Sequence, residues 1–323
     1  MVDKKDLRIV FLGTPEFAVA SLKALIEDGY NVVGVITAPD RKGGRGMKQI
    51  ITSAIKKYAL SKELKVMQPT NLKSETFQQE LKSLHADVQV IVAFRMLPEA
   101  VWDMPPYGTY NLHGSLLPKY RGAAPINWAI MRGEEYTGVT TFKLKHEIDT
   151  GSIVYQEKIP IAKNAYLNDV HDLMMEVGAQ LVIKTMSALC QGSISLIEQD
   201  PKGITKAPKL YHKNCKIDWD HSTEEVYNMV RGLSPYPVAW TELGERKLKI
   251  FRCRYTYHHH RHKTGSYHSD GKSFLSVACK DGLIFLDEVQ HAGKKRMPVR
   301  DFLNGINLKE NKLQLPIQIG RHW

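Results

Sequence analysis

Asn111 and His113 are the residues of this sequence whose types and spacing best suit chemistry at a carbonyl group. They lie two residues apart at the end of an apolar run, in the segment Asn111–Pro118. Side chains of an extended segment alternate between its two faces, so the amide and the imidazole would point the same way. Such a pair suits a carbonyl oxygen that develops negative charge. The sequence therefore predicts an oxyanion-binding pair at the end of a strand.

Asp149 is the carboxylate that we expect to pair with His113. It lies in the segment His146–Gly151, directly after a run rich in β-branched residues. A neighbouring carboxylate fixes the tautomer of an imidazole ring and favours its charged form. The spacing alone does not show that the two side chains meet. A turn amide and a buried structural histidine remain the alternative interpretation of Asn111 and His113.

The other chemical motifs are weak. The run His258–His262 suggests a metal site, but consecutive side chains on a strand point to opposite faces, so we favour a polar hairpin loop and expect no metal. The four cysteines form no C-x-x-C pair, which indicates a reduced, cytoplasmic setting. The turn at Gly13 lacks the full G-x-G-x-x-G spacing of dinucleotide sites, and neither a Walker loop nor a nucleophile elbow is present.

The charge of the chain favours a polyanionic partner. The net charge is +11, and residues 211–323 carry 19 Lys and Arg against 12 Asp and Glu, so that +7 of it lies in this third. The segment Ala38–Lys48 places three glycines among four cations and predicts a flexible basic loop that could wrap phosphates. An ordinary basic surface is the alternative. No uninterrupted apolar run approaches the roughly 18 residues of a membrane span.

Strand and helix patterns alternate through the first hundred or so residues. This order predicts an α/β fold with a parallel-rich sheet, in which ligands bind at the carboxyl ends of the strands. A long helix is expected at about 167–189, followed by a polar linker. Short β-rich segments with glycine turns then predict a small barrel or sandwich. We expect a catalytic domain at 1–190, a linker at 191–210 and a C-terminal domain at 211–323.

The sequence resembles the folate-dependent formyltransferase family over nearly its whole length. The segments that carry the resemblance are Phe11–Ala18, Pro39–Arg41, Gly44–Gly46, Asn111–Pro118, Arg121–Ile126, Thr137–Thr140, Asp149–Gly151, Ala207–Leu210 and Ile217–Trp219. The resemblance implies a Rossmann-like domain that binds 10-formyltetrahydrofolate and a C-terminal OB-like β-barrel.

The resemblance also implies an activity and its partners. The formyl group would pass to the α-amino group of methionyl-initiator tRNA for translation initiation, in a cytoplasmic enzyme that we expect to be a monomer with no metal and no membrane contact. A sibling formyltransferase acting on a sugar nucleotide or another small amine is the main alternative. A catalytically silent RNA-binding protein and a nicotinamide oxidoreductase are weaker ones.

Three groups of residues are implied to form the sites. The matches to catalytic residues are Asn111, His113 and Asp149. The matches to folate-binding residues are Phe94, Arg95, Met96, Leu97, Ser115, Leu116, Leu117 and Pro118. The residues expected to contact tRNA are Arg41, Lys42, Arg45, Lys48, Lys209, Lys294, Lys295 and Arg296.

Overall fold

The computed structural model describes residues 2–305, apart from the side chain of Arg45. The chain forms two compact units. The first comprises Met1–Pro125, Tyr136–Pro160 and His171–Ala207. The second comprises Ile126–Glu135, Ile161–Val170 and the chain from Pro208 onwards. Two segments that precede Pro208 by several tens of residues therefore belong to the second unit. The domain boundaries expected from the sequence stay a prediction.

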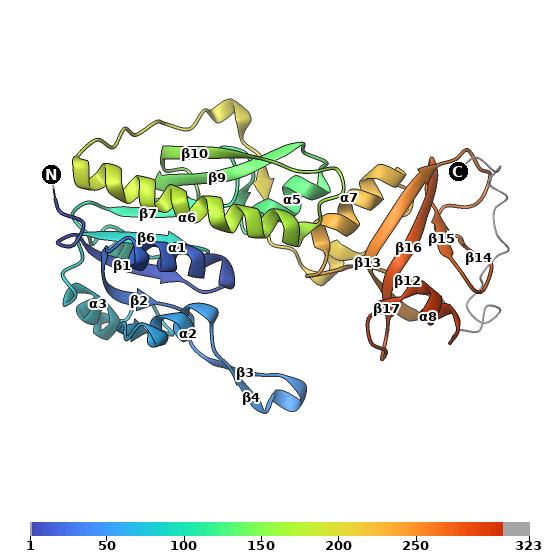
Figure 1. Cartoon of the computed structure of the whole chain (residues 1–323), viewed down its shortest axis with the longest axis horizontal. Coiled ribbons are helices and arrows are strands. Elements are labelled where there is room, and N and C mark those ends of the chain that lie inside the picture. Colours follow the sequence, from blue (N-terminus) through green and yellow to red (C-terminus); the bar gives the residue numbers. More distant parts are fainter. Residues whose placement is uncertain (1, 306–323) are drawn as a thin grey trace. The chain divides into compact units, whose positions relative to one another are not determined.

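A seven-stranded sheet forms the centre of the first unit (Figure 1). Its strands, in spatial order, are β10 (Ser152–Pro160), β9 (Tyr136–Lys143), β7 (Thr109–His113), β6 (Val88–Val92), β1 (Arg8–Gly13), β2 (Asn31–Ile36) and β5 (Val66–Met67). The five strands from β7 to β5 are parallel, whereas β9 and β10 are antiparallel to their neighbours. The carboxyl ends of β1, β6 and β7 therefore meet at one edge, as the strand and helix order predicted.

Both faces of this sheet are buried. Its helices are α1 (Glu16–Glu27), α2 (Ala54–Ser61), α3 (Glu75–Lys82), α4 (Glu99–Trp102) and the long α6 (Leu167–Gln191). Val10 and Leu12 of β1 pack with Phe77 and Leu81 of α3 on one face, while the intervening Phe11 is fully buried on the other. Continuous apolar runs are typical of such doubly covered strands.

Helix α6 lies along the half of the sheet that holds the candidate catalytic strand (Figure 1). A Cβ placed on Gly178 would lie 2.8 Å from Leu112 of β7, and Thr185 shares a 2.7 Å hydrogen bond with Thr141 of β9. Helix α6 is also long and apolar enough to span a membrane by composition, a weak signal that buried core helices share. Its buried Met174 and Val182 belong to the core of the protein.

The basic segment after β2 forms a hairpin, and the expectation of an irregular loop is wrong for its arms. Strand β3 (Arg41–Gly43) pairs with β4 (Gln49–Ile51), and a 3-10 turn, η1 (Arg45–Met47), joins them. Gly44 and Gly46 have φ values of 75° and 72°, which glycine adopts without strain. Figure 1 shows this hairpin extending from the body of its unit.

The second unit is built on an antiparallel sheet in the order β12, β13, β16, β15, β14. Their bounds are β12 (Ala239–Leu243), β13 (Arg246–Tyr257), β14 (Tyr267–Ser269), β15 (Leu275–Ala278) and β16 (Gly282–His291), with β17 (Met297–Pro298) also paired to β16. The sheet curls (Figure 1), but β12 and β14 do not pair within residues 2–305, so it forms a half-barrel consistent with the expected OB-like fold.

Three further helices complete the described chain: α5 (Pro125–Met131), α7 (Thr223–Leu233) and α8 (Val299–Leu303). A capping box begins α7, where Ser222 and Glu225 bond each other's backbone N–H groups. Val226, Val230 and Leu233 of α7 belong to the same buried cluster as the strand residues Leu248 and Leu286. The remaining short elements are β8 (Arg121–Gly122), β11 (Lys206–Ala207), η2 (Pro201–Gly203) and η3 (His212–Cys215).

Candidate active site

Asn111 and His113 lie at the carboxyl end of β7, between β6 and β9. Their spacing of two along a strand places both side chains on one face, as predicted. The side chain of His113 is buried, and Asn111 is half-buried. The Oδ1 atom of Asn111 is buried and has no hydrogen-bond partner among the described residues. A buried acceptor or donor without a partner costs about 1–3 kcal/mol, so this amide is well placed to bind a ligand.

The two ring nitrogens of His113 have different neighbours. Nε2 lies 2.9 Å from the carbonyl oxygen of Tyr120. A carbonyl oxygen only accepts, so Nε2 carries a proton and donates it. In the neutral ring Nδ1 is then the bare nitrogen, and it lies 3.8 Å from Oδ2 of Asp149. Protonation of the ring would place an N–H group on Nδ1, facing the carboxylate.

Asp149 reaches this position from the turn between β9 and β10. Its backbone has a φ of 55°, in the left-handed region that aspartate tolerates better than most residues. The N–H group of Gly122 donates a 2.8 Å hydrogen bond to Oδ2 of Asp149. The carboxylate side chain is only 11% exposed, so its interaction with His113 is weakly screened. The structure therefore brings together two residues that the spacing alone did not connect.

One short segment, Tyr120–Gly122, contacts both His113 and Asp149. The Tyr120 carbonyl accepts from His113, and the Gly122 N–H donates to Asp149. Gly122 has a φ of 127°, and a Cβ there would lie 2.6 Å from the carbonyl oxygen of Ala207. Only glycine fits this close approach without displacing the backbone. These backbone roles of Tyr120 and Gly122 were not predicted from the sequence, where Gly122 was the available signal of a close approach.

Comparison with known proteins identifies the family. Residues 7–186 match the formyl transferase family model, and residues 209–307 match the model of the formyl transferase C-terminal domain.

The chain belongs to the formyl transferase family.

Two relatives within the formyl transferases are named methionyl-tRNA formyltransferase. The protein from Parabacteroides distasonis is 53% identical over 94% of this chain and 96% of its own length. The protein from Bacteroides fragilis is 50% identical over 95% of this chain and 97% of its own. A solved structure, the N-formyltransferase from Helicobacter canadensis in complex with folinic acid and dTDP-3-aminofucose, has a TM-score of 0.65 at 18% identity, covering 92% of this chain and all of that one. At this identity the likeness concerns the fold alone.

The residues that the formyl transferase resemblance assigned to folate binding flank the candidate site. Ser115 and Leu117 are buried: Ser115 Oγ donates to the Lys119 carbonyl at 2.6 Å, and the Leu117 N–H donates to Thr140 Oγ1 at 3.2 Å. Leu116 and Pro118 are half-buried. Ser115 and Leu117 therefore hold the turn, while the side chains of Leu116 and Pro118 are more available to a ligand.

The second expected folate segment follows β6. Phe94 is half-buried, Leu97 is buried, and Met96 is 75% exposed. Arg95 donates to the carbonyl oxygens of Pro69 and Thr70, so its guanidinium is held by this unit's own backbone. This segment lies at the same sheet edge as Asn111 and His113, because β6 and β7 are adjacent and parallel.

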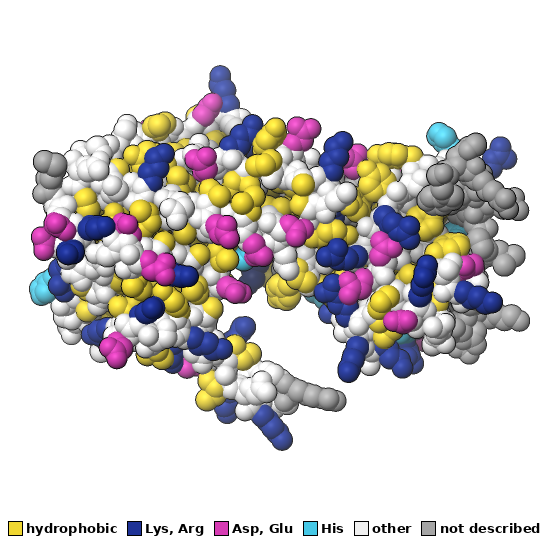
Figure 2. All heavy atoms as spheres, in the orientation of Figure 1, with side chains coloured by type: hydrophobic (Ala, Val, Ile, Leu, Met, Phe, Trp, Pro, Cys, Tyr) yellow, Lys and Arg dark blue, Asp and Glu magenta, His cyan; other side chains and the backbone are white. Residues whose placement is uncertain are grey.

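The cations expected to contact tRNA differ in their partners. In the first unit, Arg41, Lys42 and Lys48 are exposed on the hairpin, while the Arg45 side chain lies outside the described part. Figure 2 shows Lys and Arg side chains along this hairpin. In the second unit, Lys209, Lys294 and Lys295 are exposed. Arg296 instead binds the Glu288 carboxylate through two hydrogen bonds of 2.6 and 2.5 Å and stacks on Phe251.

The histidine run is not arranged as a metal centre. Within the described chain, no three His, Cys, Asp or Glu side chains are placed to hold a metal ion. His260 Nε2 bonds the Gly282 carbonyl at 3.1 Å, and the His260 and His262 rings lie 5.7 Å apart.

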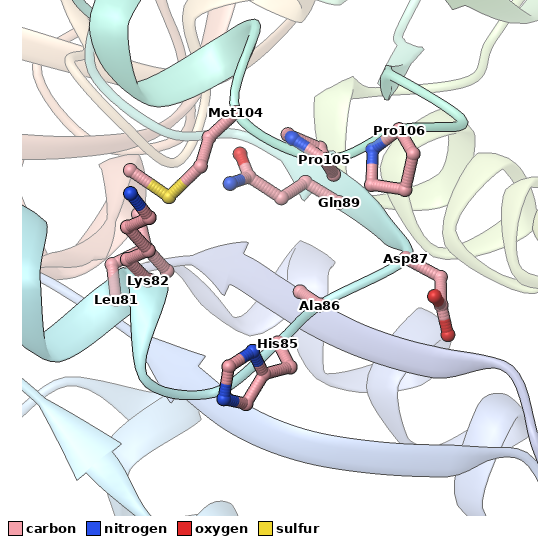
Figure 3. A pocket seen from close by; sticks show the side chains of 9 residues that line it. All are labelled: Leu81, Lys82, His85, Ala86, Asp87, Gln89, Met104, Pro105 and Pro106. Atoms are coloured by element: carbon pink, nitrogen blue, oxygen red, sulfur yellow. The ribbon is translucent and has the colours of Figure 1, made fainter.

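A cavity of about 300 Å³ lies at the opposite edge of the sheet from the candidate site (Figure 3). Its lining residues are Leu81, Lys82, His85, Ala86, Asp87, Gln89, Met104, Pro105 and Pro106. These lining residues lie near the amino ends of β6 and β7. Asn111 and His113 lie at the carboxyl end of β7. The buried Gln89 amide already donates to the Val101 carbonyl and accepts from Thr109.

Proposed function

We propose that this formyl transferase moves a formyl group from 10-formyltetrahydrofolate to the α-amino group of methionyl-initiator tRNA. The observation that carries the proposal is the 53% and 50% identity, over nearly the whole chain, to relatives that bear the name methionyl-tRNA formyltransferase. The arrangement of Asn111, His113 and Asp149 supports this reaction class, because an amide, an imidazole and a carboxylate lie together at a sheet edge.

The folate co-substrate supplies an activated formyl carbon. As the methionine amine attacks this carbon, the formyl oxygen gains negative charge. The Asn111 amide and protonated Nδ1 of His113 donate hydrogen bonds to it. Removal of one such donor commonly lowers the rate by about 10²–10³. The oxygen would bind close to Nδ1, since Nε2 is occupied by the Tyr120 carbonyl.

Asp149 has two roles in this proposal. Its carboxylate orients the His113 ring, because Oδ2 lies 3.8 Å from Nδ1. It also accepts the proton that the attacking amine releases, directly or through a water molecule. The carbon–nitrogen bond to methionine forms, the bond to the folate nitrogen breaks, and that nitrogen takes up a proton.

The folate is held by residues at the same edge. Phe94 to Leu97 and the turn Ser115 to Pro118 would line its site, with Leu116 and Pro118 offering side-chain surface and Ser115 and Leu117 holding the backbone. The unpaired Oδ1 of Asn111 is an acceptor, so it fits a site for a ligand that donates a hydrogen bond.

The tRNA is held by cations on each unit. Arg41, Lys42, Arg45 and Lys48 of the hairpin, and Lys209, Lys294 and Lys295 of the second unit, would contact phosphates. Arg296 contributes less, because its charge is already offset by Glu288. The enzyme works as a cytoplasmic monomer without a metal or a membrane partner.

A formyl-transfer assay with three acceptors tests the function. Wild-type protein and 10-formyltetrahydrofolate are incubated with methionyl-initiator tRNA, methionyl-elongator tRNA or a dTDP-amino sugar. We expect rapid formylation of the initiator tRNA and little product with the sugar. Formylation of the sugar nucleotide with no product on either tRNA would replace this proposal with the sibling activity.

A further inference from the structure

The segment expected to be a linker packs against the candidate site within the first unit. Ile197 pairs with Ile153 of β10 through two backbone hydrogen bonds of 2.7 and 2.9 Å. The next residue, Glu198, accepts from Lys145 Nζ at 2.7 Å and from Ser152 Oγ at 2.8 Å. Lys145 and Ser152 flank the turn that carries Asp149. This part of the chain therefore holds both ends of the Asp149 turn.

Gln199 holds the middle of the same turn. Its Nε2 donates to the carbonyl oxygens of Asp149 and Gly151, each at 2.8 Å. Its Oε1 accepts from Nε and Nη2 of Arg121 at 3.1 and 2.6 Å. The amide orientation is fixed by these partners, because the reversed amide would face two carbonyls with an oxygen and a guanidinium with an NH₂ group.

These four hydrogen bonds join the two backbone segments that set the catalytic geometry. Arg121 lies between Tyr120, whose carbonyl binds His113, and Gly122, whose N–H group binds Asp149. The Asp149 turn is held in a left-handed conformation and is crowded, since a Cβ on Gly151 would lie 1.8 Å from the Lys143 carbonyl oxygen. The gap between His113 Nδ1 and Asp149 Oδ2 thus depends on how these segments are tied together.

We propose that Gln199 is a positioning residue for formyl transfer, which ties the Asp149 turn to Arg121 and so sets the Asp149 carboxylate against the His113 ring. Gln199 acts through these residues and contacts no reacting atom. The continuation of the same segment supports this role: Thr205 Oγ1 accepts from the Tyr120 N–H at 2.8 Å, and β11 pairs with β8. The kinetic test of this inference rests on the proposed function. The structural claim, that Gln199 ties the Asp149 turn to Arg121, does not.

Gln199→Glu is the variant that most selectively removes the hydrogen bonds to the Asp149 turn. A glutamate has the same length and still accepts from Arg121, but it loses both donors to the Asp149 turn. We expect kcat for methionyl-tRNA to fall by up to roughly 10²-fold, the loss associated with a displacement of about 1 Å at a reacting group. The KM for tRNA and the KM for folate should change little. Gln191→Glu is the matched control, because Gln191 is exposed at the end of α6 and bonds only Ser187 among the described contacts.

A double-mutant cycle separates positioning from a general loss of structure. If Gln199 acts through Asp149, then Gln199→Glu should cause little further loss of kcat in an Asp149→Asn background. An equal fold-loss in both backgrounds would overturn the proposal, as would wild-type kcat in the folded single variant.

Hydrogen exchange provides a test that needs no activity. Peptides covering residues 146–152 should exchange faster in Gln199→Glu than in wild-type protein or in Gln191→Glu. Wild-type exchange in this turn would overturn the inference. If the wild-type protein failed to formylate methionyl-tRNA, the proposed function would be wrong. The exchange result would still decide whether Gln199 holds the Asp149 turn in place.

Gln199→Met is the second variant, to be used if Gln199→Glu does not fold. It removes the same two donors without adding a charge, and the same kinetic and exchange results are expected. Failure of both variants to fold would also overturn the proposal, because Gln199 would then support the unit as a whole.

Discussion

At the scale of single residues, the site depends on the distinct neighbours of the two His113 nitrogens. The Tyr120 carbonyl fixes the proton on Nε2, and the Asp149 carboxylate faces Nδ1. In a doubly protonated ring, Nδ1 would be the nitrogen that donates to an oxyanion. Asn111 adds an amide whose Nδ2 can donate to the same oxyanion, while its buried acceptor Oδ1 has no partner among the described residues. Both groups are preorganised, so little reorganisation is needed as charge develops.

We predict that His113→Ala and Asn111→Ala each lower kcat by about 10²–10³, the usual loss for one oxyanion donor. Asp149→Ala should be similar or worse, because the ring loses its orienting partner. Single-turnover formylation of methionyl-tRNA measures the effect, with circular dichroism to verify folding. His146→Ala is the control, since the His146 side chain is 83% exposed. A folded His113→Ala protein with wild-type turnover would show that the assignment is wrong.

Sequence reasoning reached some of these residues and not others. The period of a strand was enough to place Asn111 and His113 on one face. Asp149 was named as their partner, but its contact with His113 depends on the order of β7, β9 and β10, which local spacing does not encode. Gln199 was missed because a polar residue between prolines and glycines is typical of a linker. Its role comes from tertiary hydrogen bonds alone.

At the scale of elements, the turn between β9 and β10 has almost no steric freedom at Gly151. Because a Cβ would lie 1.8 Å from the backbone oxygen of Lys143, no side-chain movement can relieve the contact. The backbone of the turn would have to move, and Asp149 with it.

We predict that Gly151→Ala destabilises the protein by roughly 1–3 kcal/mol, the common cost of overpacking. It should also lower kcat, because the carboxylate moves away from His113. Chemical denaturation measures the first effect and single-turnover kinetics the second. Gly305→Ala is the control, since its nearest neighbour would lie at 3.9 Å. Unchanged stability and kcat in Gly151→Ala would contradict the steric argument.

The basic hairpin was only partly predictable. Glycines and cations correctly indicated an exposed basic segment between regular elements. They obscured the strands β3 and β4, because three-residue strands are too short to show an alternating apolar pattern. The exposed Ile50 and Met47 lie beside the cations, so the hairpin presents apolar as well as charged side chains.

Lys42→Ala tests whether the hairpin binds phosphates. We expect a higher KM for methionyl-tRNA and a salt dependence of log KM whose slope is smaller by about 0.7–0.9, the value for one lost phosphate contact. The value of kcat should stay near wild type. Arg296→Ala is the informative comparison, because Arg296 is already paired with Glu288 and should change the slope less. Equal slopes in wild type and Lys42→Ala would remove Lys42 from the tRNA-binding surface.

At the scale of the whole molecule, the division of the chain differs from its sequence order. The second unit includes Ile126–Glu135 and Ile161–Val170, which are inserted between strands of the first. Asn127 Nδ2 donates to the Gly232 carbonyl at 2.7 Å, and Arg231 Nη1 donates to the Ala165 carbonyl at 2.6 Å. Composition could locate the polar stretch after α6, but it could not show that earlier segments pack with later ones.

Truncation after Leu210 tests this division. The shortened chain keeps the folate-binding residues but loses the partners of Asn127, Ala165 and Tyr166, whose hydroxyl bonds the Cys253 backbone at 3.2 Å. At about 1 kcal/mol for each of these four hydrogen bonds, and about 2–4 °C for each kcal/mol in a domain of this size, we expect a melting temperature roughly 8–16 °C lower. Thermal denaturation and binding of a hydrophobic dye measure the change, and the apolar Met131 should add to dye binding because it packs against the removed core.

Folate should still bind, whereas formylation of methionyl-tRNA should be lost with the cations of the second unit. A truncated chain that melts with the full-length protein and binds no dye would show that the inserted segments are stable without the C-terminal part.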